Sequence, residues 1–203
     1  METCETTNGK SDIELYKLFL KGDNDAFNYL IIKHRKMLTN FIMTYVKNIE
    51  IAEDIAQDSF MYMIINKVEY DFKYSFKTYL YTIAKSRALN YLKREKRTIY
   101  VEDAILNNVN LEGNIENEFI IKENYNALIK TIKKLKNEYQ IVIYLYYFQG
   151  FKYKEICKIL NQSMPKTKMA IHRAKKLLKK FVKEDNNYDE GWWSICWWSL
   201  EKI

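Results

Sequence analysis

Apolar residues recur at intervals of three and four along most of the chain, and this is the period of an amphipathic helix. Between the helical stretches, residues 67–75 mix aromatic and charged side chains without a period, which predicts a loop. Only 5 glycines and 1 proline occur in 203 residues, too few for a fold of many strands and turns. The pattern predicts an all-α protein with helices over residues 12–47 (broken near 22–23), 50–66, 76–97 and about 123–183.

The helical stretches group into two small domains. Residues 1–97 are predicted to form the first and residues 123–183 the second. Between them, residues 98–122 are rich in Asn and acidic residues and contain the helix breaker Gly113, which is typical of a linker. Residues 184–203 form an acidic tail that holds all four tryptophans of the chain. Clustered tryptophans indicate a binding or membrane-interface surface, or rings that fold back on the second domain.

Composition excludes several classes of function. No Gly-rich run suitable for a phosphate-binding loop is present, and two histidines leave little for His-dependent catalysis. The three cysteines are far apart and odd in number, which fits neither a disulfide framework nor a zinc site and favours a cytoplasmic location. No secretory signal or apolar run of about 20 residues occurs. We expect a binding protein rather than an enzyme, with no catalytic residues, no metal, no cofactor and no small-molecule substrate.

The net charge of +7 is unevenly distributed. Residues 72–97 hold eight basic residues against one acidic residue, and residues 128–183 hold fifteen against two. Such dense basic blocks are typical of proteins that bind nucleic acid, because each neutralised phosphate releases condensed counterions. A Lys-rich solvated surface is the alternative that charge alone leaves open.

The second basic block contains a helix-turn-helix pattern. Residues 153–160 form a short amphipathic helix, a polar connection comes next, and Pro165 stands just inside a longer basic helix, where its missing N–H is harmless. The second helix of such a motif enters the major groove of DNA. A plain helical hairpin is the alternative, but the basic outer face favours DNA. The residues predicted to project outward are Lys166, Lys168, Met169, His172, Arg173 and Lys176.

Three segments together resemble a known family. The string SMPKTKMAIHRAKKLL at 163–178 is similar to the closing helix of sigma-70-like factors of the extracytoplasmic-function type, S-V-G-T-V-K-S-R-L-H-R-A-R-K-K-L. Upstream, IAEDIAQDSF at 51–60 resembles their core-binding segment A-E-D-L-T-Q-E-V-F. TYLYTIAKSRALNYLKREKR at 78–97 resembles their W-L-Y-T-I-A-R-N-R-A-I-D-Y-L-R-R-K-R helix. The three segments occur in the family's order and extend over most of the chain.

The resemblance implies a sigma factor that binds core RNA polymerase and directs transcription initiation at promoter DNA. It also implies an anti-sigma factor as a partner, because such partners commonly inhibit members of this family. It places polymerase binding on an acidic strip of the helix at 50–66: Glu53, Asp54, Gln57 and Asp58. It places recognition of the melted −10 element on interleaved basic and aromatic residues: Lys73, Tyr74, Lys77, Tyr79, Arg87, Arg94 and Arg97. The six outward residues of the helix-turn-helix would recognise the −35 element.

The sequence also departs from the family pattern. Tyr79 stands where Trp is common, and Pro165, Met169 and Ala170 replace Gly, Ser and Arg in the recognition helix. These changes make the promoter sequence unpredictable by analogy. Two other functions remain open: a sigma-like helix-turn-helix regulator that does not engage the polymerase, and a basic RNA-binding or structural protein.

Overall fold

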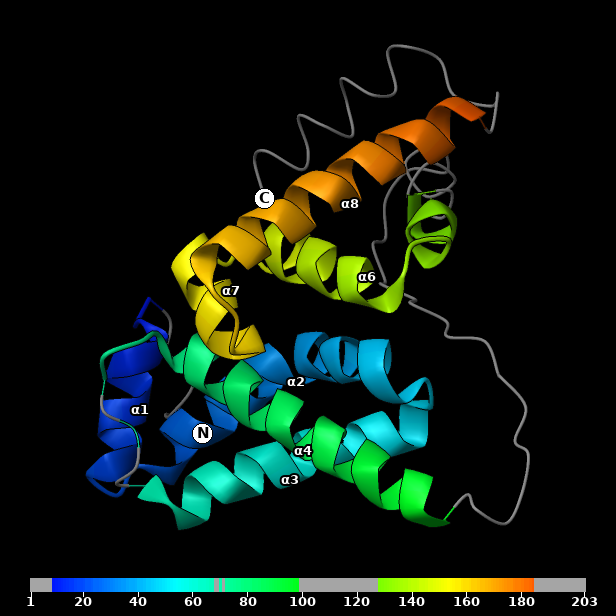
Figure 1. Ribbon diagram of the computed structural model, residues 1–203. Helices are drawn as coiled ribbons and strands as arrows, with labels where there is room; N and C mark the ends of the chain where they lie inside the picture. Colours follow the sequence, from blue (N-terminus) through cyan, green and yellow to red (C-terminus); the bar gives the residue numbers. More distant parts are fainter. Residues whose placement is uncertain (1–8, 68–69, 71, 99–127, 185–203) are drawn as a thin grey trace, which may run out of the picture. The chain divides into compact units, whose positions relative to one another are not determined.

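The computed structural model describes residues 9–67, 70, 72–98 and 128–184, and all of its regular elements are helices. The described helices divide into two compact units (Figure 1). The first unit holds the helices up to residue 98, and the second holds most of residues 128–184. Residues 99–122 of the predicted linker and the Trp-rich tail, 185–203, lie outside the described residues, whereas Thr98 is the last residue of α4.

The first unit contains α1 (Asp12–Leu20), α2 (Asn24–Val46), α3 (Ile49–Ile65) and α4 (Phe76–Thr98). Polar side chains start all four helices, because the first backbone N–H groups of a helix lack partners within it. At α4, Ser75 Oγ accepts from the Thr78 N–H at 3.2 Å. Ser11 and Glu14 form a reciprocal capping box, Asp23 accepts from the Ala26 N–H at 3.1 Å, and Asn48 accepts from the Ile51 N–H at 3.1 Å. The predicted break at 22–23 is therefore a helix start.

Apolar faces of all four helices meet in one core. Helix α2 packs against α1, α3 and α4, and α3 packs against α4. The predicted inward face of α4 is buried, with Leu80 and Ala84 at 0% exposure and Ile83 at 9%. Other large side chains that are fully buried in this core are Leu15, Tyr16, Phe27, Leu30, Leu38, Phe41, Ile42, Met63, Phe76 and Tyr81.

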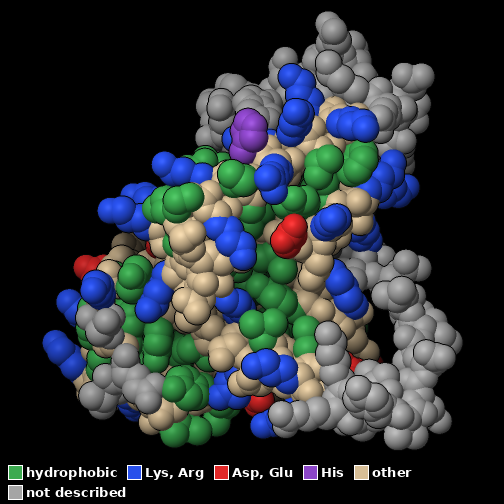
Figure 2. All heavy atoms as spheres, in the orientation of Figure 1, with side chains coloured by type: hydrophobic (Ala, Val, Ile, Leu, Met, Phe, Trp, Pro, Cys, Tyr) green, Lys and Arg blue, Asp and Glu red, His purple; other side chains and the backbone are tan. Residues whose placement is uncertain are grey.

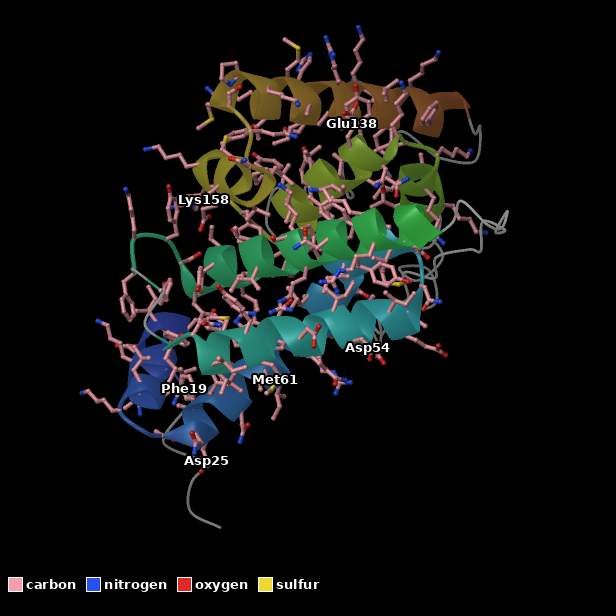
Figure 3. All side chains as sticks on the ribbon, turned by 60° about the horizontal axis from the view of Figure 1, so that its bottom comes forward. Phe19, Asp25, Asp54, Met61, Glu138 and Lys158 are labelled. Carbon is pink, nitrogen blue, oxygen red and sulfur yellow. The ribbon has the colours of Figure 1, made fainter. Side chains whose placement is uncertain are left out.

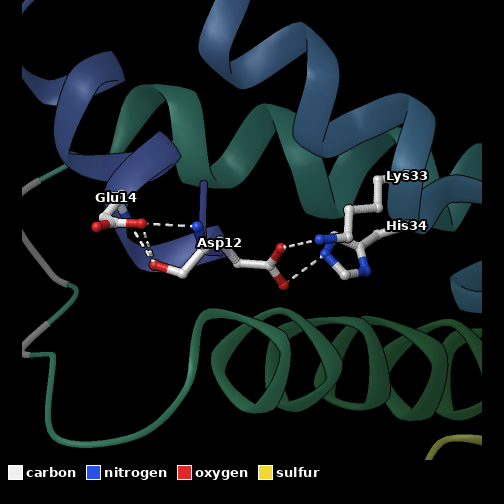
Figure 4. A network of polar contacts seen from close by, with 5 residues as sticks. Asp12, Glu14, Lys33 and His34 are labelled. Atoms are coloured by element: carbon white, nitrogen blue, oxygen red, sulfur yellow. Dashed lines mark hydrogen bonds and ion pairs between the residues drawn. The ribbon is translucent and has the colours of Figure 1, made fainter. Parts of the chain in front are cut away.

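A polar network joins the start of α1 to α2 (Figure 4). The Asp12 carboxylate accepts from Lys33 Nζ at 2.7 Å and lies 2.8 Å from Nε2 of His34, whose ring is buried. Burial alone would raise the pKa of Asp12, but the hydrogen bonds and charges of His34 and Lys33 outweigh it and lower the pKa from 3.8 to about 2.

Replacing Asp12 by Asn is expected to lower the free energy of unfolding by about 1–2 kcal/mol near neutral pH. Because folding lowers this pKa, the contribution is present above pH 3.8 and is lost as the pH falls toward 2. Denaturant unfolding at neutral and acidic pH measures it, with Asp54→Asn on the exposed side of α3 as the matched control. Equal losses in the two variants, or no pH dependence, would contradict the assignment.

The second unit contains helical turns at 128–133, α6 (Asn137–Ile143), a π-helical turn (Tyr144–Phe148), α7 (Tyr153–Leu160) and α8 (Met164–Glu184). Helix α6 packs on α8. In the π-helical turn the Gln149 N–H donates to the Tyr144 carbonyl at 3.0 Å, five residues back. Ile156 and Ile159 of α7 and Ile171 and Ala174 of α8 are buried, as their helical period predicts.

Candidate functional surfaces

The predicted acidic strip lies on the outer side of α3. Asp54, Gln57 and Asp58 are exposed and Glu53 is half-buried, whereas Ala52, Ile55, Ala56 and Ser59 on the opposite side are buried. The buried side fixes the rotation of the helix about its axis. The structure therefore brings the four predicted polymerase-binding residues together on one ridge.

An apolar surface continues this strip toward the end of α3. Met61 is 51% exposed and Ile65 is 74% exposed, and both share the face of Asp54 because they come seven and eleven residues after it. Figure 3 labels Asp54 and Met61. Met61 lies on this exposed face although it is apolar. The seven-residue spacing from Asp54 was the signal that places it outside. We call Asp54, Asp58, Met61 and Ile65 the α3 stripe.

One contact links the two functional predictions for the first unit. The Arg87 guanidinium on α4 lies 3.6 Å from the Asp58 carboxylate and 5.2 Å from the ring centre of Tyr62. Arg87 was predicted to contact −10 DNA, and Asp58 was predicted to contact the polymerase. In the structure the two side chains join α3 to α4, and both binding roles stay predictions.

The loop before α4 carries an aromatic cluster. The Tyr70 ring stacks on Tyr79 at 5.1 Å, meets Tyr16 edge-on at 5.3 Å and lies 4.5 Å from Phe72. Phe72 is 37% exposed and has a φ of 57°, a left-handed conformation that a bulky residue adopts only when its surroundings hold it there. Lys17 Nζ lies 5.5 Å from its ring centre. This exposed ring on a buried aromatic base is suited to stacking on an unpaired base.

The other predicted −10 residues differ in their exposure. Lys73 and Arg94 are exposed, whereas Tyr74, Lys77 and Tyr79 are half-buried. Lys77 Nζ lies 6.0 Å from the ring centre of Tyr81. The side chain of Arg97 lies outside the described part of the chain. The sequence prediction omitted Tyr70 and Phe72 from the site, although the mixture of aromatic and charged residues in this loop had indicated them.

The helix-turn-helix in the second unit has the predicted geometry. Helix α7 ends at Leu160, Asn161 adopts a left-handed φ of 52°, and α8 begins at Met164. Pro165 is the second residue of α8. Cys157 of α7 is half-buried, and its Sγ lies 3.3 Å from the hydroxyl oxygen of the buried Thr167 on α8.

All six predicted −35 residues are exposed on α8. Met169 is 52% exposed, and Lys166, Lys168, His172, Arg173 and Lys176 are exposed as well. Ile171, Ala174 and Leu178 on the other side of the same helix are buried. Basic side chains are frequent and acidic ones rare over α7 and α8 (Figure 2). The exposed face of α8 therefore groups four Lys or Arg side chains with His172 and Met169.

The described residues show neither a metal site nor a membrane-spanning helix. Among them, no group of three or more His, Cys, Asp or Glu side chains is arranged to hold a metal ion. No described helix combines the length and apolar character that crossing a membrane requires.

These features define a two-domain helical protein of the helix-turn-helix class. Residues 30–98 match the family model described as Sigma-70 region 2, and residues 125–178 match the one described as Sigma-70, region 4. The chain belongs to the sigma-70 family of RNA polymerase sigma factors, within its extracytoplasmic-function (ECF) group. The family and fold class predicted from the sequence are confirmed.

Individual relatives agree with this assignment. The RNA polymerase sigma factor YlaC of Bacillus subtilis is 30% identical over 165 residues, which cover 77% of this chain and 91% of the relative. The ECF RNA polymerase sigma factor SigW of the same organism is 27% identical, with 81% and 92% covered. In fold, the chain is similar to the sigma factor RpoE of Bartonella quintana, solved with the anti-sigma factor NepR. That likeness has a TM-score of 0.64 at 18% identity and covers 77% of this chain and 96% of the other.

Proposed function

We propose that the two domains divide promoter recognition between them. The first domain, residues 1–97, docks on core RNA polymerase through the acidic strip of α3 and recognises the melted −10 element through the loop at 67–75 and α4. The second domain, residues 123–183, recognises the −35 element through α8. The protein acts by binding rather than by catalysis, in the cytoplasm, where core polymerase and DNA meet.

The observation that carries this proposal is the helix-turn-helix with its exposed basic face. Six predicted base- and phosphate-contacting residues share the open side of α8, while the buried side packs it in place. A rigid helix with donors on its open face is suited to the major groove, where each base pair presents a distinct pattern of donors and acceptors.

An anti-sigma factor is the regulatory partner that we propose for this chain. The similar RpoE structure contains such a partner, NepR. The α3 stripe supports this proposal, because it places exposed acidic and apolar side chains on one ridge that a partner helix can cover.

The −10 half of the proposal is tested at Phe72. Phe72→Ala is expected to slow open-complex formation about tenfold, because stacking on an unpaired base is worth about 1–3 kcal/mol. Permanganate reactivity of unpaired thymines in the −10 region, followed over time with the assembled holoenzyme, measures this rate.

The matched control is Phe72→Tyr, which keeps an aromatic ring on the same left-handed backbone and should open the promoter at nearly the wild-type rate. A template whose −10 region is already unpaired should reduce the defect of the alanine variant. If Phe72→Ala opens duplex promoter as fast as the wild type, the loop does not stack on the melted strand.

A further inference from the structure

A groove lies on the surface of the second unit between α6 and α8. It has a volume of about 640 Å³, within the range of about 300–1,000 Å³ that is common for ligand sites. Its lining consists of Tyr139 from α6 and Arg173, Lys176, Leu177, Lys179 and Lys180 from α8. Arg173, Leu177 and Lys180 are four and seven residues apart, so they share one helix face. We call this feature the α6–α8 groove.

The lining of the α6–α8 groove is suited to a large aromatic ring with acidic neighbours. Tyr139 and Leu177, both half-buried, offer apolar surface, and the long stems of the basic residues extend it. Lys and Arg heads are attracted to aromatic faces, and to that of Trp most strongly. The second unit already contains this kind of contact, because Lys175 Nζ lies 5.5 Å and 5.1 Å from the ring centres of Tyr146 and Tyr147.

The chain supplies such an occupant directly after α8. Residues 185–203, the Trp-rich tail, hold all four tryptophans (192, 193, 197 and 198) and have a net charge of −3, opposite to that of the groove. The end of α8 at residue 184 is about 16 Å along the helix from Arg173. Seven extended residues reach about 23 Å, so Trp192 can return as far as Arg173.

We propose that the Trp-rich tail docks in the α6–α8 groove of its own chain. Indole rings pack against Leu177 and Tyr139, and the acidic residues Asp185, Asp189 and Glu190 lie near the basic rim. Covalent attachment makes even a weak contact effective. A groove–tail dissociation constant of about 0.1 mM would leave the groove about 90% occupied at an effective concentration of about 1 mM.

Docking of the tail has a consequence for DNA, and this consequence rests on the proposed function. Arg173 and Lys176 line the groove and also belong to the predicted −35 surface. A docked tail therefore competes with the −35 element for the same side chains. At the occupancy given above, the tail lowers the DNA affinity of the free protein about tenfold.

Tryptophan fluorescence tests the docking without DNA or polymerase. All four tryptophans lie in the tail, so selective excitation of tryptophan reports on the tail alone. In the full chain the tail should be shielded from acrylamide. Lys176→Glu combined with Lys179→Glu should raise the quenching constant about threefold, because two exposed rim cations then repel the acidic tail. Lys133→Glu combined with Lys154→Glu, exposed lysines of the same unit that do not line the groove, should leave quenching unchanged.

Three results would overturn the docking. Equal quenching in all variants would mean that the groove is not the binding surface. Shielding that increases with protein concentration would indicate a second copy of the chain instead. Shielding that appears only when vesicles of phosphatidylglycerol and phosphatidylcholine are added would make the tail a membrane-binding segment.

The competition with DNA is measured separately, on a −35 duplex selected from a random library. Replacing all four tryptophans by alanine should raise the affinity of the free protein about tenfold, and an unchanged affinity would overturn the competition. The groove variants are not used here, because Lys176 is itself predicted to contact DNA. If the tail is not shielded from acrylamide, the docking is wrong and the proposed function is unaffected. If the tail is shielded but the protein binds no promoter, the proposed function is wrong and the docking is unaffected.

Discussion

Replacing Asp54 and Gln57 together by lysine is expected to weaken association with core RNA polymerase at least about a hundredfold, or roughly 3 kcal/mol. Both side chains are exposed on α3, and the residues that hold the helix in place lie on its opposite side. A basic partner helix would then face two new positive charges. Asp58 is left intact because its contact with Arg87 joins α3 to α4. Equilibrium binding to purified core enzyme measures the effect.

The matched control is Asp25→Lys combined with Asn28→Lys. These residues are exposed on α2, and the pair changes the net charge by the same +3 (Figure 3 labels Asp25 and Asp54). The control should bind core enzyme nearly as the wild type does, and thermal unfolding should show that both variants fold. Unchanged binding of the α3 variant, or an equal loss in the control, would remove the acidic strip from the polymerase interface.

Arg173→Ala is expected to cost about 1–3 kcal/mol in affinity for the −35 element and to relax the preference at one base pair. Arg173 lies on the exposed face of α8, and a guanidinium that pairs with the two acceptors of a guanine supplies discrimination of this size. Binding to a library of −35 variants gives both the affinity and the base preference.

Lys179→Ala is the comparison for this measurement. Lys179 lies further along α8, where a phosphate contact is expected. Loss of this contact should weaken binding to all sequences alike and reduce the magnitude of the slope of log affinity against log salt by about 1. Both variants are compared in the chain whose four tryptophans are alanine, so that the tail does not contribute. An Arg173→Ala protein with an unchanged base preference would show that this residue does not contact bases.

Helical period was sufficient to predict most of the fold, because each helix buries one face. The period places Ile55 and Ala84 inside and Asp54 and Arg173 outside, and the structure agrees. At Met61 hydrophobicity alone gives the wrong side, whereas the seven-residue spacing from Asp54 places this apolar residue on the exposed face, as the structure shows. Apolar residues at a docking surface have this effect, since they are matched to a partner rather than to the core.

Contacts between helices could not be predicted from the sequence. The Asp58–Arg87 contact joins residues of α3 and α4 whose facing depends on how the two helices cross, and no local spacing encodes that angle. The α6–α8 groove likewise requires Tyr139 to lie beside Leu177, which is distant in sequence. The left-handed backbone at Phe72 is held by the aromatic rings around it, so it too depends on tertiary packing.

Run-off transcription with purified bacterial core RNA polymerase tests the central claim most directly. Templates are selected by the holoenzyme from a genomic library and transcribed with and without this protein. Transcripts with defined starts should appear only when the protein is present, and the Asp54→Lys, Gln57→Lys variant should abolish them. Absence of any protein-dependent transcript, while the protein still binds the same DNA, would show a DNA-binding regulator that does not engage the polymerase.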